Sequence, residues 1–360
     1  MMPETPELST DTGLTSTPPP AGQERAVSTI TDVASLAGVS IATASKAMNG
    51  KSGVSAVTRR RVLEAADKLR FRSNQLAANL VTGRSFTVGL ITNDSYGRFA
   101  MPVMLGAEDA LEAGKIAIFL CDGRDDPIRE DYYVRTLLGR RVDGIIVTGK
   151  VTDPRRPIKL SYPVPVVYAN CESQDPRDVS IVTDDERAAR LAVEHLLAMG
   201  RRNIAHISGG TDLRAARERS SGALKALDDA ELPMVGRNPF FGVWSEEWGY
   251  QAAHIVLRTC DSVDGIFCGS DQIARGVVDG VQALGRRVPE DIAVVGIDNW
   301  KVVAEASRPP LTTVDLNLPQ VGRLAAELLL AAIEGQAVEG RRLVAPSLIV
   351  RESTRVTVGS

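Results

Sequence analysis

Residues 29–50 read TITDVASLAGVSIATASKAMNG, and this stretch predicts two short helices joined by a tight turn. Thr29 and Asp32 have the spacing of a capping box, in which two side chains satisfy backbone N–H groups at the start of a helix. Gly38 ends the first helix, because glycine readily adopts the left-handed backbone of a tight turn. Ser40 is a favourable N-cap for the second helix. The segment is therefore a candidate helix-turn-helix.

An isolated helix–glycine–helix pattern is equally typical of an ordinary packed hairpin, so the surrounding sequence must decide between the two. A third helix is predicted from about Ser55, because apolar residues recur at helical spacing as far as Leu69. Residues 28–84 contain nine Lys and Arg against three Asp and Glu, a formal charge of +6 within a chain of −3, which leaves −9 for the remainder. A small basic helical module on an acidic body indicates that the module binds a polyanion such as DNA.

The N-terminal tail and the scattered reactive side chains carry less information. Residues 1–27 are rich in Thr, Ser and Pro, and we expect them to be disordered. We expect a cytoplasmic protein, because neither a signal peptide nor a bilayer-length apolar run is present. The cysteines and histidines lack metal-ligand spacing and predict neither a metal nor a cofactor. We expect a buried reduced thiol at each of Cys121, Cys171, Cys260 and Cys268, and structural or surface roles for His195, His206 and His254.

From Thr87 onward, short apolar runs alternate with segments of helical periodicity. The runs are typical of buried parallel strands: TVGLIT, IAIFLC, VDGIIV, VPVVYA, IAHISG, GIFCG and IAVVGI, with SLIVRES as the last. The helical segments between them are 102–114, 128–140, 184–199, 214–230, 245–259 and 271–284. This alternation predicts an α/β fold of two doubly wound parallel sheets, in two subdomains that face each other across a cleft. Ligands of such sheets bind beyond the carboxyl ends of the strands.

The segment TITDVASLAGVSIATASKAMNGKSGVSAVTRRRVLEAADKLRFRSNQLAANL resembles the headpiece and hinge of the lactose-repressor (LacI) family of transcription regulators. RRVDGIIV, VTDDERAARLAVEHLLAMGRRNIAHISG, SDQIARG, VVGIDN and PPLTTV are similar to the effector domain of that family. The resemblance implies a periplasmic-binding-protein-like pair of subdomains with crossovers near 184 and 315–345. It also implies the domain limits, which are a tail at 1–27, a helix-turn-helix domain at 28–72, a hinge helix and linker at 73–84, and an effector-binding and dimerisation domain at 85–360.

By this resemblance, Ile41 and Ala42 open a recognition helix that enters the major groove of DNA, and Lys46 lies one turn further along. The apolar side chains of Ile41 and Ala42 suit contacts with thymine methyl groups. Lys46 stands where the family usually has Arg, so it keeps the charge but lacks the fork that reads guanine. Candidate phosphate contacts, for which helix capping or simple solvation is the alternative role, are Thr29, Ser40, Thr43, Ser45 and Asn49.

Residues 73–80 resemble the hinge helix, which in this family inserts a leucine into the minor groove at the centre of the operator. Leu80 stands at that position, where such a wedge kinks DNA by unstacking a base step. Asn74 is a further candidate DNA contact in the same helix. Ser73 and Ala78 depart from the common family residues, which are Pro and either Arg or Gln, and this weakens the expected hinge contacts. The alternative role of Leu80 is packing within a linker.

The effector site is also implied residue by residue. Arg219 matches an arginine that forks onto ligand hydroxyls or carboxylates, and Asp298 matches a ligand-binding aspartate that follows the strand IAVVGI. Trp244 stands where an aromatic ring commonly packs on the ligand. Sugars need this mixture, since paired charged groups bind hydroxyls and a flat apolar face covers the ring C–H groups. For a single Arg or Asp, a surface ion pair is the alternative.

Three further residues complete the candidate effector site. Asp94 and Asn170 follow the strands TVGLIT and VPVVYA and so lie at strand ends that face the cleft. Ser270 replaces a frequent amide, which leaves the exact ligand open. Asp271 and Gln272 come next, and we expect them to start a helix rather than contact the ligand.

These patterns together predict a dimeric transcription repressor that binds operator DNA and is released by a small-molecule effector, most simply a sugar of carbohydrate metabolism. A corepressor would use the same parts, so the sign of the response stays open. The chain lacks a C-terminal leucine heptad, which favours a dimer over a tetramer. An exported sugar-binding protein would need a signal peptide. A sugar-processing enzyme would need a nucleophile, phosphate loop or metal cluster, and none stands out.

Overall fold

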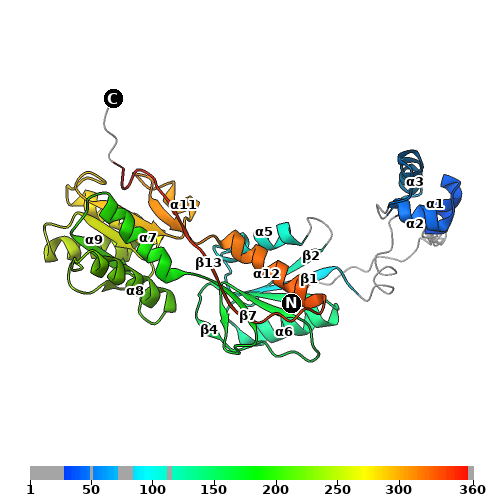
Figure 1. Ribbon diagram of the computed structural model, residues 1–360, viewed down its shortest axis with the longest axis horizontal. Coiled ribbons are helices and arrows are strands. Elements are labelled where there is room, and N and C mark those ends of the chain that lie inside the picture. The colour runs from blue at the N-terminus through cyan, green and yellow to red at the C-terminus, as the bar shows by residue number, and fades with distance from the viewer. Residues whose placement is uncertain (1–27, 49–51, 72–83, 112–115, 356–360) are drawn as a thin grey trace, which may run out of the picture. The chain divides into compact units, whose positions relative to one another are not determined.

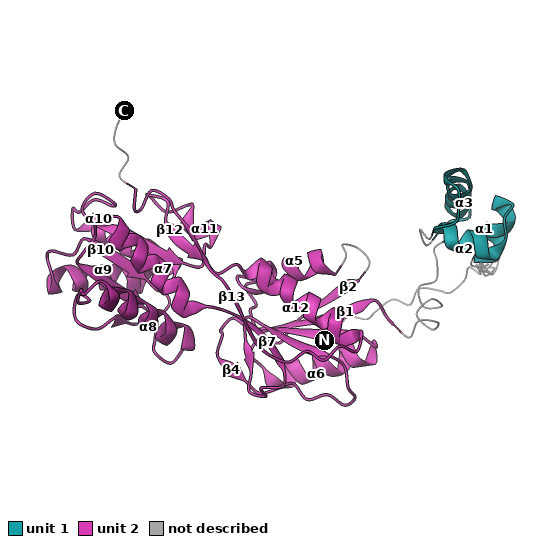
Figure 2. Ribbon diagram, viewed as in Figure 1, with its two compact units in different colours: residues 1–81 teal, residues 82–360 magenta. Residues whose placement is uncertain are grey.

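The computed structural model describes residues 28–48, 52–71, 84–111 and 116–355, and the chain divides into two compact units, 1–81 and 82–360 (Figure 2). The predicted tail at 1–27 and most of the predicted hinge lie outside the described residues, as do Asn49, Asn74 and Leu80. The α/β fold class with an N-terminal helical module is confirmed.

The first unit consists of three short helices, α1 (Ile30–Ala37), α2 (Ile41–Met48) and α3 (Ala56–Lys68). The expected capping box is present, because the backbone N–H of Thr29 donates to the carboxylate of Asp32 at 2.7 Å and the hydroxyl of Thr29 accepts from the N–H of Asp32. Gly38 adopts a φ of 62°, which lets the chain turn directly from α1 to α2. The core consists of small side chains that allow close helix approach: Val33, Ala34, Ala37, Ala44, Ala47, Val62, Ala65 and Ala66.

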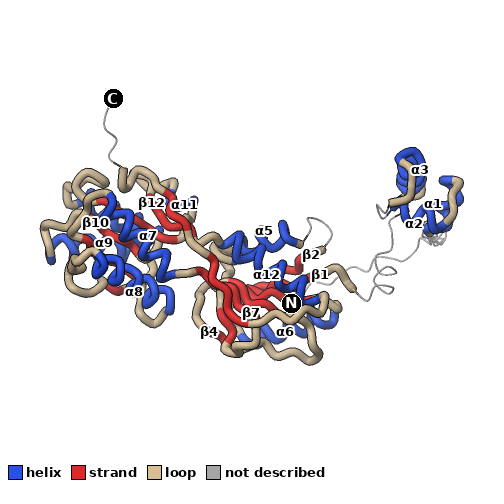
Figure 3. The backbone as a smooth tube through the Cα atoms, in the orientation of Figure 1, coloured by secondary structure: helices blue, strands red, loops and turns tan. Residues whose placement is uncertain are grey.

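The second unit contains two lobes, each built on a six-stranded sheet (Figure 3). In the first lobe all strands are parallel, in the order β13 (Gly340–Val344), β7 (Val179–Thr183), β5 (Val166–Ala169), β3 (Gly144–Thr148), β1 (Thr87–Thr92) and β2 (Ala117–Asp122). Helices α5 (Ala100–Ala110) and α12 (Leu318–Ile333) cover one face, and α6 (Pro127–Gly139) covers the other (Figure 1). The short strands β4 (Pro154–Arg155) and β6 (Glu172–Ser173) pair beside this sheet.

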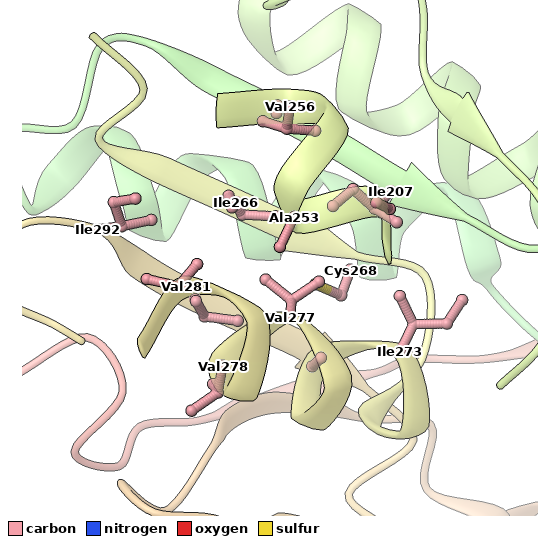
Figure 4. Packing of buried hydrophobic residues seen from close by; sticks show 14 of the residues in the cluster. Ile207, Ala253, Val256, Ile266, Cys268, Ile273, Val277, Val278, Val281 and Ile292 are labelled. Carbon is pink, nitrogen blue, oxygen red and sulfur yellow. The ribbon is translucent and has the colours of Figure 1, made fainter. Parts of the chain in front are cut away.

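The second lobe has the strand order β14 (Ser347–Ile349), β12 (Thr312–Asp315), β11 (Ala293–Ile297), β10 (Gly265–Cys268), β8 (Ile204–Ser208) and β9 (Phe240–Phe241). Only β14 runs antiparallel to its neighbour. Helices α7 (Asp185–Ala198) and α8 (Arg214–Asp229) cover one face of the sheet. Helices α9 (Glu246–Thr259) and α10 (Asp271–Ala283) cover the other (Figure 4), and the short α11 (Lys301–Ala304) follows β11.

Close helix contact depends on glycine between α9 and α10. A Cβ atom on Gly276 would lie 1.8 Å from the carbonyl oxygen of Glu246, and one on Gly249 would lie 2.1 Å from that of Ile273. No side chain could occupy either position without separating the helices. The valines of α10 pack with the side chains of β10 in an apolar core (Figure 4).

The chain passes between the lobes at β7–α7, β12–α12 and β13–β14. Because the parallel strands β1, β3, β8, β10 and β11 end toward the same junction, the loops after them supply the candidate site.

We predict that the buried His206 makes the protein less stable in acid. Its ring stacks on Phe267 with centroids 4.4 Å apart, and its Nδ1 donates to the carbonyl oxygen of Phe267. Burial lowers the pKa of His206 to about 4 from its ordinary 6.5. The unfolded chain therefore takes up a proton before the folded one, and stability is lost as pH falls from about 6.5 to about 4, by roughly 2–4 kcal/mol.

Urea unfolding of the wild type and His206→Gln at several pH values tests this. The difference between their unfolding free energies should change across that pH window and be constant above pH 7. A difference that is independent of pH would contradict the assignment of a neutral buried histidine.

Candidate functional site

The exposed face of α2 carries the candidate base-reading side chains. Ala44 and Ala47 point into the core of the first unit, and this fixes the opposite face of the helix toward solvent. Ile41 is 50% exposed although it is a large apolar residue, and Ala42 and Lys46 are exposed beside it. A short helix with an outward apolar and cationic surface, in a basic module, is suited to a DNA groove.

The candidate phosphate contacts of this unit also have local capping roles. The hydroxyl of Ser40 accepts from the backbone N–H of Thr43 at 3.2 Å, and the two hydroxyls are 2.9 Å apart. Thr29 caps α1 in the same way, and Ser45 is half-buried. Capping fixes the first turn of α2, so these residues position the exposed face whether or not they also contact phosphate.

A cavity of about 260 Å³ lies between the two lobes of the second unit. Five of the six candidate effector residues line it: Asn170, Arg219, Trp244, Ser270 and Asp298. The first lobe contributes Asn170, and the second lobe contributes the other four. The strand-end loops therefore bring together side chains separated by more than a hundred positions in the sequence.

Asp94 is the exception. Its carboxylate accepts hydrogen bonds from the backbone N–H groups of Phe99 and Ala100, at 2.6 and 2.9 Å, and it is not among the described residues that line the cavity. Asp94 therefore caps the start of α5. Through that cap it fixes the position of the loop that precedes α5.

Arg219 is the buried cation of the cavity. Its Nε donates to Asp185 at 2.7 Å, one guanidinium nitrogen donates to the carbonyl oxygen of Gly269, and another lies 3.8 Å from Asp298. Burial alone would lower the pKa of Arg219, but the carboxylates of Asp185 and Asp298 more than offset this and raise it. Arg219 is therefore a permanently charged donor held rigidly between the start of α7 and the end of β10.

Arg98, which was not predicted from the sequence, completes the network. It lies in the loop between β1 and α5, and its guanidinium pairs with Asp298 and donates to the side chain of Gln272 at 3.2 Å. It also lies over the ring of Trp300, 4.6 Å from the centroid. Arg98 thus reaches from the first lobe into the second. The position of Arg98 in a loop after a strand was the one sequence signal that it could belong to the site. No motif indicated its partner Asp298, which lies 200 positions further along the chain.

Asp298 accepts a hydrogen bond from Arg98, lies within ion-pair distance of Arg219 and has a strained backbone. Its φ is 113°, a backbone region that side-chain-bearing residues rarely adopt, at a cost of about 1–3 kcal/mol. Burial raises the pKa of the Asp298 carboxyl, and the guanidinium groups of Arg98 and Arg219 oppose that rise. Strain and burial at one carboxylate between two cations are typical of a functional position.

Neighbouring residues hold this arrangement in place. Asp271 begins α10, as predicted, and its carboxylate accepts from the N–H of Trp300 at 2.7 Å and from the hydroxyl of Thr313. Burial raises the pKa of Asp271 to about 8. Ser270 caps the same helix through the N–H of Ile273. These two residues support the cavity wall, although Ser270 also faces the cavity.

Trp244 provides the aromatic wall. Its indole lies so close to Gly209 that a Cβ there would be 2.0 Å from the ring, and the guanidinium of Arg219 is 5.8 Å from the ring centroid. Four buried polar atoms of lining residues have no hydrogen-bond partner within the described chain, namely Nε of Arg98, Nε1 of Trp244 and the hydroxyls of Thr152 and Thr183. The cavity thus presents an aromatic face together with polar atoms that a ligand could satisfy.

A larger cavity of about 650 Å³ lies within the first lobe, at the ends of β1, β2 and β3. None of the described residues that line it is aromatic, and one of its cations, Arg155, already pairs with Glu130. We therefore place the candidate small-molecule site in the smaller interlobe cavity.

Within the described residues, no helix is long and apolar enough to cross a membrane. No group of three or more His, Cys, Asp or Glu side chains in that part of the chain could hold a metal ion. All four cysteines are free thiols, and burial raises the pKa of Cys171 to about 12, so that this thiol is unreactive.

Comparison with known proteins identifies both units. Residues 29–74 match the model for bacterial regulatory proteins of the lacI family, and residues 193–354 match that for a periplasmic binding protein-like domain. The chain is 32% identical over 330 residues to catabolite control protein A of Priestia megaterium, an alignment that covers 91% of this chain and 99% of the relative.

Two solved structures are similar along most of the chain. One is the lac repressor dimer bound to operator and the anti-inducer ONPF, with a TM-score of 0.68 and 29% identity over 91% of this chain and 99% of that one. The other is a complex of the transcriptional regulator CelR with cellobiose, with a TM-score of 0.61 and 30% identity over the same shares of each chain.

We predict that Arg219→Ala destabilises the fold as well as the site. The substitution would leave Asp185 without its cation in a fully buried position, and breaking a buried ion pair on one side costs about 3–5 kcal/mol. Arg217→Ala is the matched control, because Arg217 lies on the same helix with its side chain 53% exposed. In urea unfolding, Arg219→Ala should lower the free energy of unfolding by most of that amount. Arg217→Ala should lower it by less than about 1 kcal/mol. Equal midpoints for the two variants would show that Arg219 is not structural.

Proposed function

The chain belongs to the LacI family of bacterial regulatory proteins, and from this premise we propose that it represses genes of carbohydrate metabolism and leaves its operator when a neutral sugar binds between its lobes. As a member of that family it is a DNA-binding transcription regulator and not an enzyme. The observation that carries the sugar proposal is the interlobe cavity, which combines an aromatic wall with a forked guanidinium, a carboxylate and unpartnered hydroxyl groups.

The charge balance of the cavity argues for an uncharged effector. Arg219 faces Asp185 and Asp298, Arg98 faces Asp298, and Lys150 pairs with Asp125. Each cation that lines the cavity within the described chain therefore already has a carboxylate partner. A phosphorylated or acidic ligand would have to be desolvated without an available counter-charge, which is costly. Hydroxyl groups can instead share the existing donors and acceptors.

The operator is read by α2. In this proposal Ile41 and Ala42 contact thymine methyl groups in the major groove and Lys46 contacts a base or phosphate, while Leu80 and Asn74 act in the minor groove. The effector acts by linkage, because a ligand that favours one arrangement of the lobes shifts the population that is able to hold DNA. The protein would act in the cytoplasm and be associated with the nucleoid while it is bound to DNA.

We propose that the working form is a homodimer. The edge strand β2 exposes Phe119 and Leu120, and α5, which covers a face of the same sheet, exposes Met101 and Leu105. An apolar edge strand with apolar neighbours is a surface that a second copy can cover. A dimer also places two recognition helices on the two half-sites of a palindromic operator.

We predict that Lys46→Ala weakens binding to the operator by roughly 1–3 kcal/mol if Lys46 reads a base, because the base contact is lost while most phosphate contacts stay. Lys68→Ala is the control, since Lys68 lies in the last turn of α3 rather than on the reading helix. Gel-shift or anisotropy titrations with operator and random DNA, at two salt concentrations, separate the contribution of a base contact from that of phosphate contacts. Equal losses on both DNAs would show that Lys46 contacts only phosphate.

We predict that Trp244→Ala still binds the operator but needs about 10–100-fold more sugar for release, because the ligand loses its aromatic wall. The experiment is an operator-release assay with neutral sugars and their phosphates, and Tyr250→Ala, an exposed ring on α9 outside the cavity lining, is the control. Release of the wild type by a sugar phosphate but by no neutral sugar would contradict the uncharged effector. Tighter DNA binding on sugar addition would reverse the sign of the proposed regulation.

A further inference from the structure

The interlobe cleft continues beyond the cavity described above. A second cavity of about 290 Å³ shares Arg98, Phe99 and Asp298 with the first, so the ion pair of Arg98 and Asp298 forms a wall between them. We name the cavity that contains Trp244 the first chamber and the one that contains Trp300 the second chamber. Both are lined by residues of the two lobes.

The two chambers are built on the same pattern. In the first, the guanidinium of Arg219 lies 5.8 Å from the ring centroid of Trp244, and in the second that of Arg98 lies 4.6 Å from that of Trp300. Both arginines meet the one carboxylate of Asp298. A tryptophan with a guanidinium at its ring thus occurs twice, on either side of a shared acceptor.

Such a unit has the chemistry of a site for one sugar ring. The indole supplies a flat apolar face for ring C–H groups, and the Arg–Asp pair supplies donors and acceptors in fixed directions for hydroxyls. Sites for small ligands have volumes of about 300–1,000 Å³. Each chamber by itself falls just below this range, whereas the two together fall within it.

The wall between the chambers has one fixed and one adjustable member. Asp298 is fixed, because the next residue, Asn299, is hydrogen-bonded to Thr313 and Asp315, at 3.2 and 2.9 Å. Arg98 has a long side chain that is 17% exposed, and its Nε is buried without a partner within the described chain. Arg98 has the longest side chain of the three residues that the chambers share, so its rotation would open the wall between them and uncover the face of Trp300 that it now occupies.

We propose that the effector is an oligosaccharide of at least two rings, with one ring on Trp244, the next on Trp300, and Arg98 hydrogen-bonded to hydroxyls near the linkage between them. This inference rests on the proposed function, since it takes the effector to be a sugar. In this proposal Arg98 and Trp300 determine the preference of the site for a two-ring effector over a single ring.

Calorimetric titration tests the proposal with glucose, galactose, cellobiose, maltose, lactose and cellotriose as probes. At least one disaccharide should bind on the order of 100-fold more tightly than its component monosaccharide, because a second ring is buried against an aromatic face. Trp300→Ala should remove most of that advantage and change monosaccharide affinity less than about threefold, whereas Trp300→Phe, which keeps an aromatic face, should retain much of it.

Tyr132→Ala, an exposed ring on α6 outside both chambers, should bind every probe as the wild type does. The proposal is overturned if a monosaccharide binds as tightly as every disaccharide, or if Trp300→Ala weakens both kinds of sugar equally. If no probe binds while a ligand of another class does, the sugar function itself fails. Circular dichroism of each variant verifies folding, and if Trp300→Ala is unfolded, the comparison of Trp300→Phe with Trp300→Leu decides.

Discussion

The structure of the second unit depends on one buried carboxylate, that of Asp298, placed between guanidinium groups from two different lobes. A carboxylate taken out of water is costly unless cations and hydrogen-bond donors surround it. Here Arg219 comes from the same lobe and Arg98 from the other, so the compensation is complete only when the lobes are close together. The position of the lobes and the geometry of the candidate ligand site are consequently set by the same interaction.

This arrangement gives a physical route from a small molecule to DNA. A ligand that hydrogen-bonds to Asp298 and its arginines changes the balance of forces that holds the lobes, and a change of a few kcal/mol is enough to reverse a two-state population. In the proposed function α2 of the first unit binds DNA, whereas every described residue that lines the cavity belongs to the second unit, so the effect of the ligand has to be transmitted from one unit to the other. Linkage requires only that the ligand binds the two arrangements with different affinity, and no separate signalling pathway is needed.

Much of this could be predicted from the sequence, and the failures have physical reasons. Apolar runs such as 87–92 and 204–208 are strands because they are continuous and β-branched, and five cavity residues follow from strand ends and family resemblance. Asp94 also follows a strand, but the N–H groups of the next helix capture its carboxylate, and sequence spacing does not reveal in which direction a side chain turns. Arg98 and Trp300 were not identified because their contacts join residues 200 positions apart. The strand at 179–183 and the helix at 318–333 were missed, since each stands beside a lobe crossing where the regular alternation breaks.

Sugar affinity measured twice, once with the free protein and once with the protein saturated with operator, tests the proposed linkage most directly. If a sugar in the interlobe cavity releases DNA by linkage, operator-bound protein must bind the sugar more weakly than free protein. The factor must equal that by which saturating sugar weakens operator binding, about 5–150-fold for a typical coupling. Equal sugar affinity in the two states, alongside sugar-induced loss of DNA binding, would contradict the account.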